Sequence, residues 1–465
     1  MSKQDPLVVV ANRLPVTFDG QGWAPSAGGL VTALEDSFGG ADVHWVGWSG
    51  GDEPAPAAWN GIALHSVPLS EGDLAGYYDG LANSCLWPLM HDGLRPSHMD
   101  WNWWRTYDEV NERFATAVAE IAPRGAAIWI HDYHLLLLPA LVRRLRPDVR
   151  IGYFHHIPFP PPVIFQRLPW RDQVLDGMLG ADLLGFQTMT DAAHFRALAE
   201  IAGASRYGDA IVGADGRSRV VGCYPASIDV AGFEAVAADD ATLDAARALR
   251  EAFGADRQVL LGVDRLDYTK AITARLEAFG ALLDAHPELA ERVTFVQVAV
   301  PTRDAVAEYQ AEVSEVQRLV GEINGRHAPM GSAIVHFRHG GVDRNELVAL
   351  YRAADVMVVT PWRDGMNLVA KEYVASRVDE QGVLVLSEFA GAAYELDDAV
   401  LVNPFDVAGI ADGYRAALGM PLPMQRLRMR RLRATVRAWD SRRWATSFLA
   451  ALTRAASRSA QGTAA

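Results

Sequence analysis

Short apolar strands that alternate with amphipathic helices are the feature that most constrains the fold of this chain. The first half predicts buried strands at 7–11, 127–130, 151–155 and 183–186, with helices at 107–121 and 135–145. Strands that alternate with helices form a parallel sheet with helices on both faces. The sequence therefore predicts an α/β fold, whose ligands bind at the carboxyl ends of the strands.

The same alternation restarts after an Ala/Asp-rich stretch at 235–245. The second half predicts strands at 259–263, 294–300 and 356–360, and helices at 273–286 and 346–354. We therefore expect two Rossmann-like, doubly wound domains, at 1–235 and 236–445, whose facing strand ends define a central cleft. A C-terminal helix and tail at 446–465 are expected to pack back on the first domain.

Composition excludes several classes of protein. The 465 residues exceed one ordinary core, and the net charge of -14 argues against a nucleic-acid binder. Two cysteines, Cys85 and Cys223, fit a reduced cytoplasm and cannot form a metal site alone. Neither a signal peptide nor an apolar run of membrane-spanning length is visible. We expect a cytoplasmic protein that binds neither membranes nor a metal ion.

The segment 360–376, TPWRDGMNLVAKEYVAS, is the most informative for function. It follows the apolar run 356–359, turns through polar residues, and enters a helical pattern. A strand, a tight turn and a helix N-terminus together form an anion site. Asp364 and Glu372 around such a site suggest a ligand with both phosphate and hydroxyl groups, such as a nucleotide sugar.

Further charged and glycine residues follow other predicted strands. Arg265 and Lys270 leave a strand end together, where they would stabilise charge on a diphosphate; simple surface pairing with nearby aspartates is the alternative. Lysine is rare in this chain and occurs only at Lys3, Lys270 and Lys371. Lys371 is either functional or part of a solvated helix face.

In the first half, Arg13 ends a strand, and the pair Gly28-Gly29 precedes a helix, where backbone amides can approach an anion. Asp132 follows another strand and could accept a hydrogen bond from a sugar hydroxyl. Of the adjacent His155 and His156, at most one is expected to face a cleft. No GxGxxG follows the first strand, which excludes a Rossmann dehydrogenase.

With these clusters identified, the chain resembles the trehalose-6-phosphate synthase family of retaining GT-B glycosyltransferases, from about Val8 to Leu452. The resemblance rests on SAGGL at 26–30, WVGWSG at 45–50, ANSCLWP at 82–88, HDYHL at 131–135, HIPFPPP at 156–162, RLDYTK at 265–270, RDGMNLVAKEYVAS at 363–376 and LSEFAGAA at 386–393. One departure is Ala271, where the family usually has glycine.

The resemblance implies a role for each matching residue. The phosphate of glucose 6-phosphate would be held by Arg13, Tyr78 and Arg303, with Gly28 and Gly29 in the closing loop, and the acceptor sugar by Trp87 and Asp132. On the donor side, the resemblance assigns His156 to the transferred glucose, Arg265 and Lys270 to the diphosphate, and Glu372 to the ribose. The glucose hydroxyls would be held by Asp364 and by the backbone of Gly365, Met366, Asn367, Leu368 and Val369.

The implied reaction is glucosyl transfer from a nucleotide-glucose to glucose 6-phosphate, giving α,α-trehalose 6-phosphate by front-face substitution. The nucleotide-glucose is a co-substrate rather than a cofactor, and UDP, GDP and ADP all stay open. One alternative is a pseudo-glycosyltransferase that couples a nucleotide cyclitol to an amino-cyclitol phosphate. A non-catalytic sugar-phosphate sensor is a further alternative, although none of the donor-site residues is lost. Assembly into a homodimer or homotetramer is also open.

Overall fold

The computed structural model describes residues 6–18, 20, 22–25, 42–51, 53–301 and 307–462. The chain divides into two compact units, the first formed by 1–226 and 441–465 and the second by 227–440. The second unit begins ahead of helix α9 (Val230–Ala238) because Val230 and Phe233 of this helix lie in its hydrophobic core. Among the described residues, no helix combines the length and apolar character that a membrane span requires.

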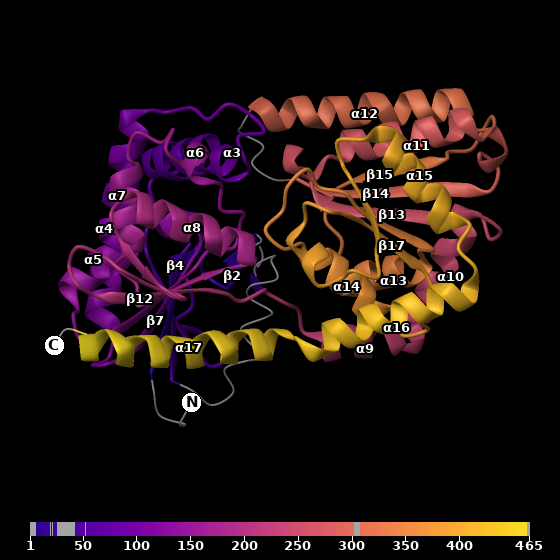
Figure 1. Cartoon of the computed structure of the whole chain (residues 1–465). Coiled ribbons are helices and arrows are strands. Elements are labelled where there is room, and N and C mark those ends of the chain that lie inside the picture. The colour runs from indigo at the N-terminus through magenta and orange to yellow at the C-terminus, as the bar shows by residue number, and fades with distance from the viewer. Residues whose placement is uncertain are drawn as a thin grey trace. The chain divides into compact units, whose positions relative to one another are not determined.

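The first unit is built on one twisted sheet (Figure 1). Its strands are β1 (Leu7–Arg13), β4 (Val43–Trp48), β5 (Ala58–Trp59), β6 (Ile62–Ser66), β7 (Ala127–His131), β8 (Arg150–Phe154), β9 (Leu183–Phe186), β10 (Ser205–Tyr207), β11 (Ala210–Val212) and β12 (Ser218–Cys223), beside the small hairpin β2 (Val16–Phe18) and β3 (Trp23–Pro25). Its helices are α2 (Glu71–Asp73), η1 (Leu74–Leu86), α3 (Trp87–Met90), α4 (Trp101–Ile121), η2 (Tyr133–Leu135), α5 (Leu138–Leu145), α6 (Pro162–Phe165), α7 (Arg171–Met178), α8 (Met189–Ile201) and α17 (Ser441–Gly462).

The centre of this sheet is parallel and runs in the order β6-β4-β1-β7-β8-β9-β12. Short antiparallel strands cover both edges, β5 at one and β10-β11 at the other. Helix α17 lies against β8, β9 and β12, where Phe448 fills the space left by Gly152 and Gly185. A Cβ at Gly185 would lie 2.6 Å from the Phe448 ring, so glycine permits this close packing.

The second unit has a fully parallel six-stranded sheet in the order β15-β14-β13-β16-β17-β18. Its strands are β13 (Gln258–Arg265), β14 (Val293–Val300), β15 (Val335–His339), β16 (Val356–Val359), β17 (Val383–Ser387) and β18 (Val400–Val402). After α9 come α10 (Asp240–Phe253), η3 (Tyr268–Lys270), α11 (Ile272–Ala285), η4 (Pro287–Leu289), α12 (Ala307–His327), α13 (Arg344–Ala353), α14 (Leu368–Ser376), η5 (Gly391–Tyr394), α15 (Val407–Leu418) and α16 (Leu422–Ala438).

Alternating side chains of the second sheet enter two separate cores. In β16, Met357 and Val359 pack with helices α9, α13, α14 and α16, whereas Val356 and Val358 pack with α11, α12 and α15. The two helical layers on opposite faces are visible in Figure 1. Successive side chains of a strand point to opposite faces, and both faces of a buried parallel sheet are covered by helices. The arrangement therefore confirms the predicted α/β, doubly wound class.

The predicted strands and helices are confirmed to within a few residues at most ends. The helix expected at 107–121 begins earlier, at Trp101, because Asp100 caps it by accepting a hydrogen bond from the amide of Asn102 at 2.6 Å. The segment 74–86 forms the π-helix η1, whose wider turn the sequence pattern does not reveal. The arginine-rich tail forms two helices: α16 belongs to the second unit and α17 to the first, and residues 439–440 separate them in the chain.

Candidate active site

Both sheets place charged residues at the point where the strand order reverses. In the first sheet, β4 lies on one side of β1 and β7 on the other. In the second sheet, β14 lies on one side of β13 and β16 on the other. In open parallel sheets, ligands bind beyond the carboxyl ends of the strands at this switch point. Arg13 ends β1 and Asp132 directly follows β7, while Arg265 ends β13 and Asp364 follows β16.

In the first unit, an aromatic stack holds Arg13. Its guanidinium carbon lies 4.6 Å from the centroid of the Trp48 ring and 5.8 Å from that of Tyr78. The Tyr78 ring in turn stacks on His134, with centroids 5.7 Å apart and an interplanar angle of 11°. The arginine side chain is exposed, so a cation is held in a defined orientation while it stays accessible to an anionic ligand.

Asp132 joins the ends of β7 and β8. Its backbone has a positive φ of 74°, which is unusual for a residue other than glycine. Its amide donates to the Phe154 carbonyl at 2.8 Å, and its carboxylate accepts from the amide of His156 at 3.1 Å. A strained backbone that its neighbours hold in place is a frequent property of functional sites.

The two neighbouring histidines differ in their surroundings. His155 is fully buried and interacts with the Tyr153 hydroxyl at 2.9 Å and with the Pro158 carbonyl at 3.3 Å. His156 is half-buried and lies 3.0 Å from His131. Burial lowers the pKa of both His155 and His156 to about 3, so both rings are neutral near neutral pH.

Trp87 lies in the interior of the first unit, with 3% of its surface exposed. Its ring centroid is 4.2 Å from that of His91 and 5.7 Å from that of Tyr133. The hydroxyl of Tyr133 donates to Asn83 at 2.9 Å, so η1 and α3 together support the segment that follows β7. The remaining first-unit predictions, Gly28 and Gly29, lie outside the described residues, as does Arg303 in the second unit.

In the second unit, the ammonium of Lys270 contacts Oδ2 of Asp364 at 2.5 Å. The same oxygen accepts from the Asn367 side-chain amide at 3.0 Å. Arg265 is exposed at the end of β13. The structure thus brings together Lys270 and Asp364, which are 94 residues apart in sequence, at the carboxyl end of the sheet.

The turn before α14, which contains Gly365, is closely packed against the start of η5 at Gly391. A Cβ at Gly391 would lie 1.9 Å from the carbonyl oxygen of Gly365, so no other residue fits there. Asn367 adopts a positive φ of 79° and caps α14 by accepting from the amide of Ala370 at 3.2 Å. The N-terminus of α14, with Leu368 and Val369 in its first turn, therefore lies beside the Lys270–Asp364 pair.

Farther along α14, Glu372 accepts a hydrogen bond from the Tyr351 hydroxyl at 2.9 Å. Burial raises the pKa of Glu372, and the Tyr351 hydrogen bond and the charge of Arg344 oppose that rise. The adjacent Lys371 is 2% exposed and forms an ion pair with Glu395 at 2.7 Å. Lys371 is therefore not part of a solvated helix face, since it ties α14 to the segment after η5.

A buried arginine that the sequence reasoning missed organises this end of the sheet. Arg275 of α11 is fully buried and forms an ion pair with Asp264 of β13. It also donates to Gln297 of β14 at 3.0 Å, to Thr360 after β16 at 3.1 Å and to the Lys270 carbonyl at 3.3 Å. A Cβ at Gly262 would lie 2.6 Å from this guanidinium, so only glycine leaves room for it. The glycine and the aspartate in the β13 segment GVDR were therefore the only local hint in the sequence of a buried cation.

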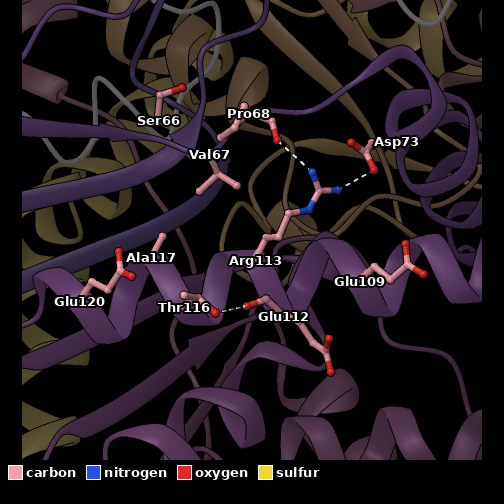
Figure 2. Close-up of a pocket in the computed structure, with 10 residues that line it drawn as sticks. All are labelled: Ser66, Val67, Pro68, Asp73, Glu109, Glu112, Arg113, Thr116, Ala117 and Glu120. Carbon is pink, nitrogen blue, oxygen red and sulfur yellow. Dashed lines mark hydrogen bonds and ion pairs between the residues drawn. The ribbon is translucent and has the colours of Figure 1, made fainter.

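A groove of about 670 Å³ in the first unit lies away from these residues. Figure 2 shows its lining, in which Arg113 of α4 points toward Asp73 and the Pro68 carbonyl. None of the residues assigned to the site lines it. Within the described parts of the chain, no three His, Cys, Asp or Glu side chains are grouped as a metal ion requires.

Two Rossmann-type sheets with cations and carboxylates at their switch points are the features of a glycosyltransferase of the GT-B architecture. The sequence model of glycosyltransferase family 20 matches residues 5–454, and the chain belongs to this family. The resemblance predicted from the motifs is thereby confirmed, and so is the enzyme class.

Individual relatives match the chain over almost its full length. A trehalose-6-phosphate synthase from Mycolicibacterium smegmatis is 46% identical over 470 residues, covering 97% of this chain and 93% of its own. The crystal structure of an α,α-trehalose-phosphate synthase (UDP-forming) from Burkholderia vietnamiensis is 36% identical, with a TM-score of 0.91 and coverage of 97% and 98%. An enzyme of the same name from Burkholderia xenovorans, in complex with glucose-6-phosphate, is 32% identical, with a TM-score of 0.89 and coverage of 96% and 100%.

Proposed function

We propose that this protein transfers glucose from a nucleotide-glucose to glucose 6-phosphate and forms α,α-trehalose 6-phosphate with retention of configuration. The observation that carries the donor half is the contact of Lys270 with Asp364 beside the N-terminus of α14. A cation, a carboxylate and the N-terminal amides of a helix in one place suit a ligand with a diphosphate and a sugar. The names of the full-length relatives support the acceptor.

On the donor side, Arg265 and Lys270 would hold the diphosphate, and they would stabilise the charge that grows on it as the glycosidic bond breaks. Asp364 and the backbone from Gly365 to Val369 would hold the hydroxyls of the glucose. Glu372, farther along α14, would accept hydrogen bonds from the ribose. The Tyr351 hydroxyl directs the Glu372 carboxyl through a 2.9 Å hydrogen bond, which supports a fixed orientation.

On the acceptor side, the exposed and stacked guanidinium of Arg13 supports a role as phosphate ligand, together with Tyr78 and Arg303. Trp87 and Asp132 would contribute to binding of the acceptor sugar, with the buried Trp87 acting through the shape of the site. Gly28 and Gly29 would close over the ligand.

In this mechanism, the leaving phosphate departs while the acceptor hydroxyl adds to the same face of an oxocarbenium-like carbon. The phosphate oxygen that leaves takes the proton of the acceptor hydroxyl. Because the acceptor adds directly to the sugar carbon, no protein side chain becomes covalently linked to the sugar. The protein contributes positioning and charge stabilisation. His156, with its neutral ring, would hydrogen-bond the transferred glucose without adding a positive charge near the developing cation.

A donor panel tests the whole scheme. UDP-, GDP- and ADP-glucose are each incubated with glucose 6-phosphate, and the released nucleoside diphosphate and the disaccharide phosphate are measured. We expect release that depends on glucose 6-phosphate, with UDP-glucose as the first candidate because the Burkholderia relatives are described as UDP-forming. Absence of release with every donor would contradict the proposal and favour the cyclitol-coupling alternative.

A further inference from the structure

His131, the last residue of β7, and His156, two residues beyond β8, form a pair of imidazoles in contact. Nδ1 of His131 lies 3.0 Å from Nε2 of His156. His131 is 1% exposed and lies among aromatic rings, including Trp129 at 4.7 Å between centroids. With its Nε2 engaged by His131, His156 has only Nδ1 left for a ligand.

A single proton lies between these two neutral rings. Burial lowers the pKa of His131 well below its usual value and that of His156 to about 3, so each ring carries one proton. In one arrangement, His131 donates from Nδ1 and His156 carries its proton on Nδ1. In the other, His156 donates from Nε2 and its Nδ1 is a bare acceptor. The tautomer of His131 therefore decides whether His156 offers a ligand a donor or an acceptor.

The buried end of His131 distinguishes the two arrangements. Its Nε2 has no hydrogen-bond partner among the described residues, and neither has Nε1 of the neighbouring Trp129. A proton on Nε2 of His131 would be a buried donor without a hydrogen-bond partner among the described residues. A bare Nε2 costs less, because orphaned buried N–H groups are the rarer and costlier case.

We propose that His131 is a positioning residue that donates from Nδ1 to Nε2 of His156 and thereby fixes His156 as the Nδ1–H tautomer. His156 then presents an N–H donor to an oxygen of the bound sugar. The tautomer follows from the geometry of the first unit alone, whereas the identity of the ligand rests on the proposed function.

Long-range ¹H–¹⁵N spectra of the protein labelled with ¹⁵N-histidine test the tautomer directly, with signals assigned by His131→Asn and His156→Asn. We expect a protonated Nδ1 and a bare Nε2 for His156 in the native protein. The reverse pattern would overturn the proposal. This result does not depend on any substrate, so it stands even if no nucleotide-glucose is turned over.

Two variants distinguish the effect of the proton that His131 donates from the effect of its packing. In His131→Asn, the amide nitrogen can replace Nδ1 as donor, so the His156 tautomer should be kept. In His131→Leu, the donor is lost, so His156 should become a mixture of tautomers and KM for the nucleotide-glucose should rise about tenfold. An unchanged tautomer and KM in His131→Leu would overturn the proposal. If the leucine variant does not fold, the native and asparagine spectra still decide it.

Discussion

The ammonium of Lys270 lies 2.5 Å from Oδ2 of Asp364, and their side chains are only 10% and 15% exposed. A pair this sheltered from water is strong enough to hold Lys270 in one place. Its two residues follow different strands of the sheet, β13 and β16. The Lys270 carbonyl is fixed separately by Arg275. Both ends of the lysine are therefore held before a ligand arrives, which is the preorganisation that transition-state stabilisation requires.

Replacing this lysine should reduce turnover strongly, and it should also cost some stability because the sheltered Asp364 loses its cation. Lys270→Met removes the cation from the leaving diphosphate, and we expect kcat to fall about 10²–10³-fold. Lys270→Arg should recover little, because the larger guanidinium does not fit a site that is 8% exposed and already in contact with Asp364. The measurement is steady-state release of the nucleoside diphosphate, with circular dichroism to verify folding.

The matched control for this variant is Arg318→Ala on α12, which removes an exposed cation whose partners, Glu315 and Glu322, lie on the same helix. It should leave kcat unchanged. Turnover of Lys270→Met close to that of the unaltered protein would refute the assignment of Lys270 to the diphosphate.

Periodicity and strand-end chemistry predicted most of the fold and the positions of the charged residues. The sheet cores follow from runs such as 356–359, whose side chains alternate between two helical layers. Arg275 could not be predicted in the same way, because a single arginine in a helical pattern is normally solvated. Its partners Asp264, Gln297 and Thr360 converge only when three strands are placed side by side.

Arg275 should be essential for stability as well as for the site. Arg275→Met leaves the buried Asp264 carboxylate without its cation, which should lower the free energy of unfolding by about 3–5 kcal/mol. The double variant Arg275→Met/Asp264→Asn should recover part of this loss, since no buried charge is then unpaired. Urea unfolding measures both values.

The control for Arg275 is Arg437→Met on α16, where the arginine is 55% exposed and pairs with Glu234. This exposed pair should contribute at most about 1 kcal/mol. Equal losses for the buried and the exposed arginine would show that the network around Arg275 adds nothing.

Ala271 adopts a left-handed backbone, with φ of 53° and ψ of 40°, a conformation that favours glycine. Ala271→Gly should relieve about 1–2 kcal/mol of strain. It also removes a buried methyl group, worth about 0.8 kcal/mol, and makes the unfolded chain freer by about 0.5–1 kcal/mol. We therefore expect almost no net change in thermal stability.

The contrasting variant Ala271→Val should be strongly destabilised, because a β-branched residue is a poor fit to this backbone and the site is fully enclosed. Thermal melts of both variants check the prediction. A valine variant as stable as the glycine variant would be incompatible with a left-handed residue 271.

The Tyr351–Glu372 hydrogen bond should set the pH dependence of donor binding. Burial raises the pKa of Glu372, and the Tyr351 hydroxyl opposes that rise by stabilising the carboxylate. If the ionised carboxylate accepts hydrogen bonds from the ribose, KM for the nucleotide-glucose rises as the pH falls through this raised pKa. Tyr351→Phe removes the opposing hydrogen bond, so the rise in KM should begin at higher pH.

Glu372→Gln supplies the control, because an amide does not titrate and its KM should be high but independent of pH over the same interval. The comparison needs KM and kcat at each pH, since a change confined to KM identifies donor binding and not chemistry. Identical pH profiles for the native enzyme and Tyr351→Phe would mean that Glu372 stays ionised without its tyrosine, or that it does not contact the ribose. The glutamine variant separates these two cases, because only in the second would its KM equal the native value.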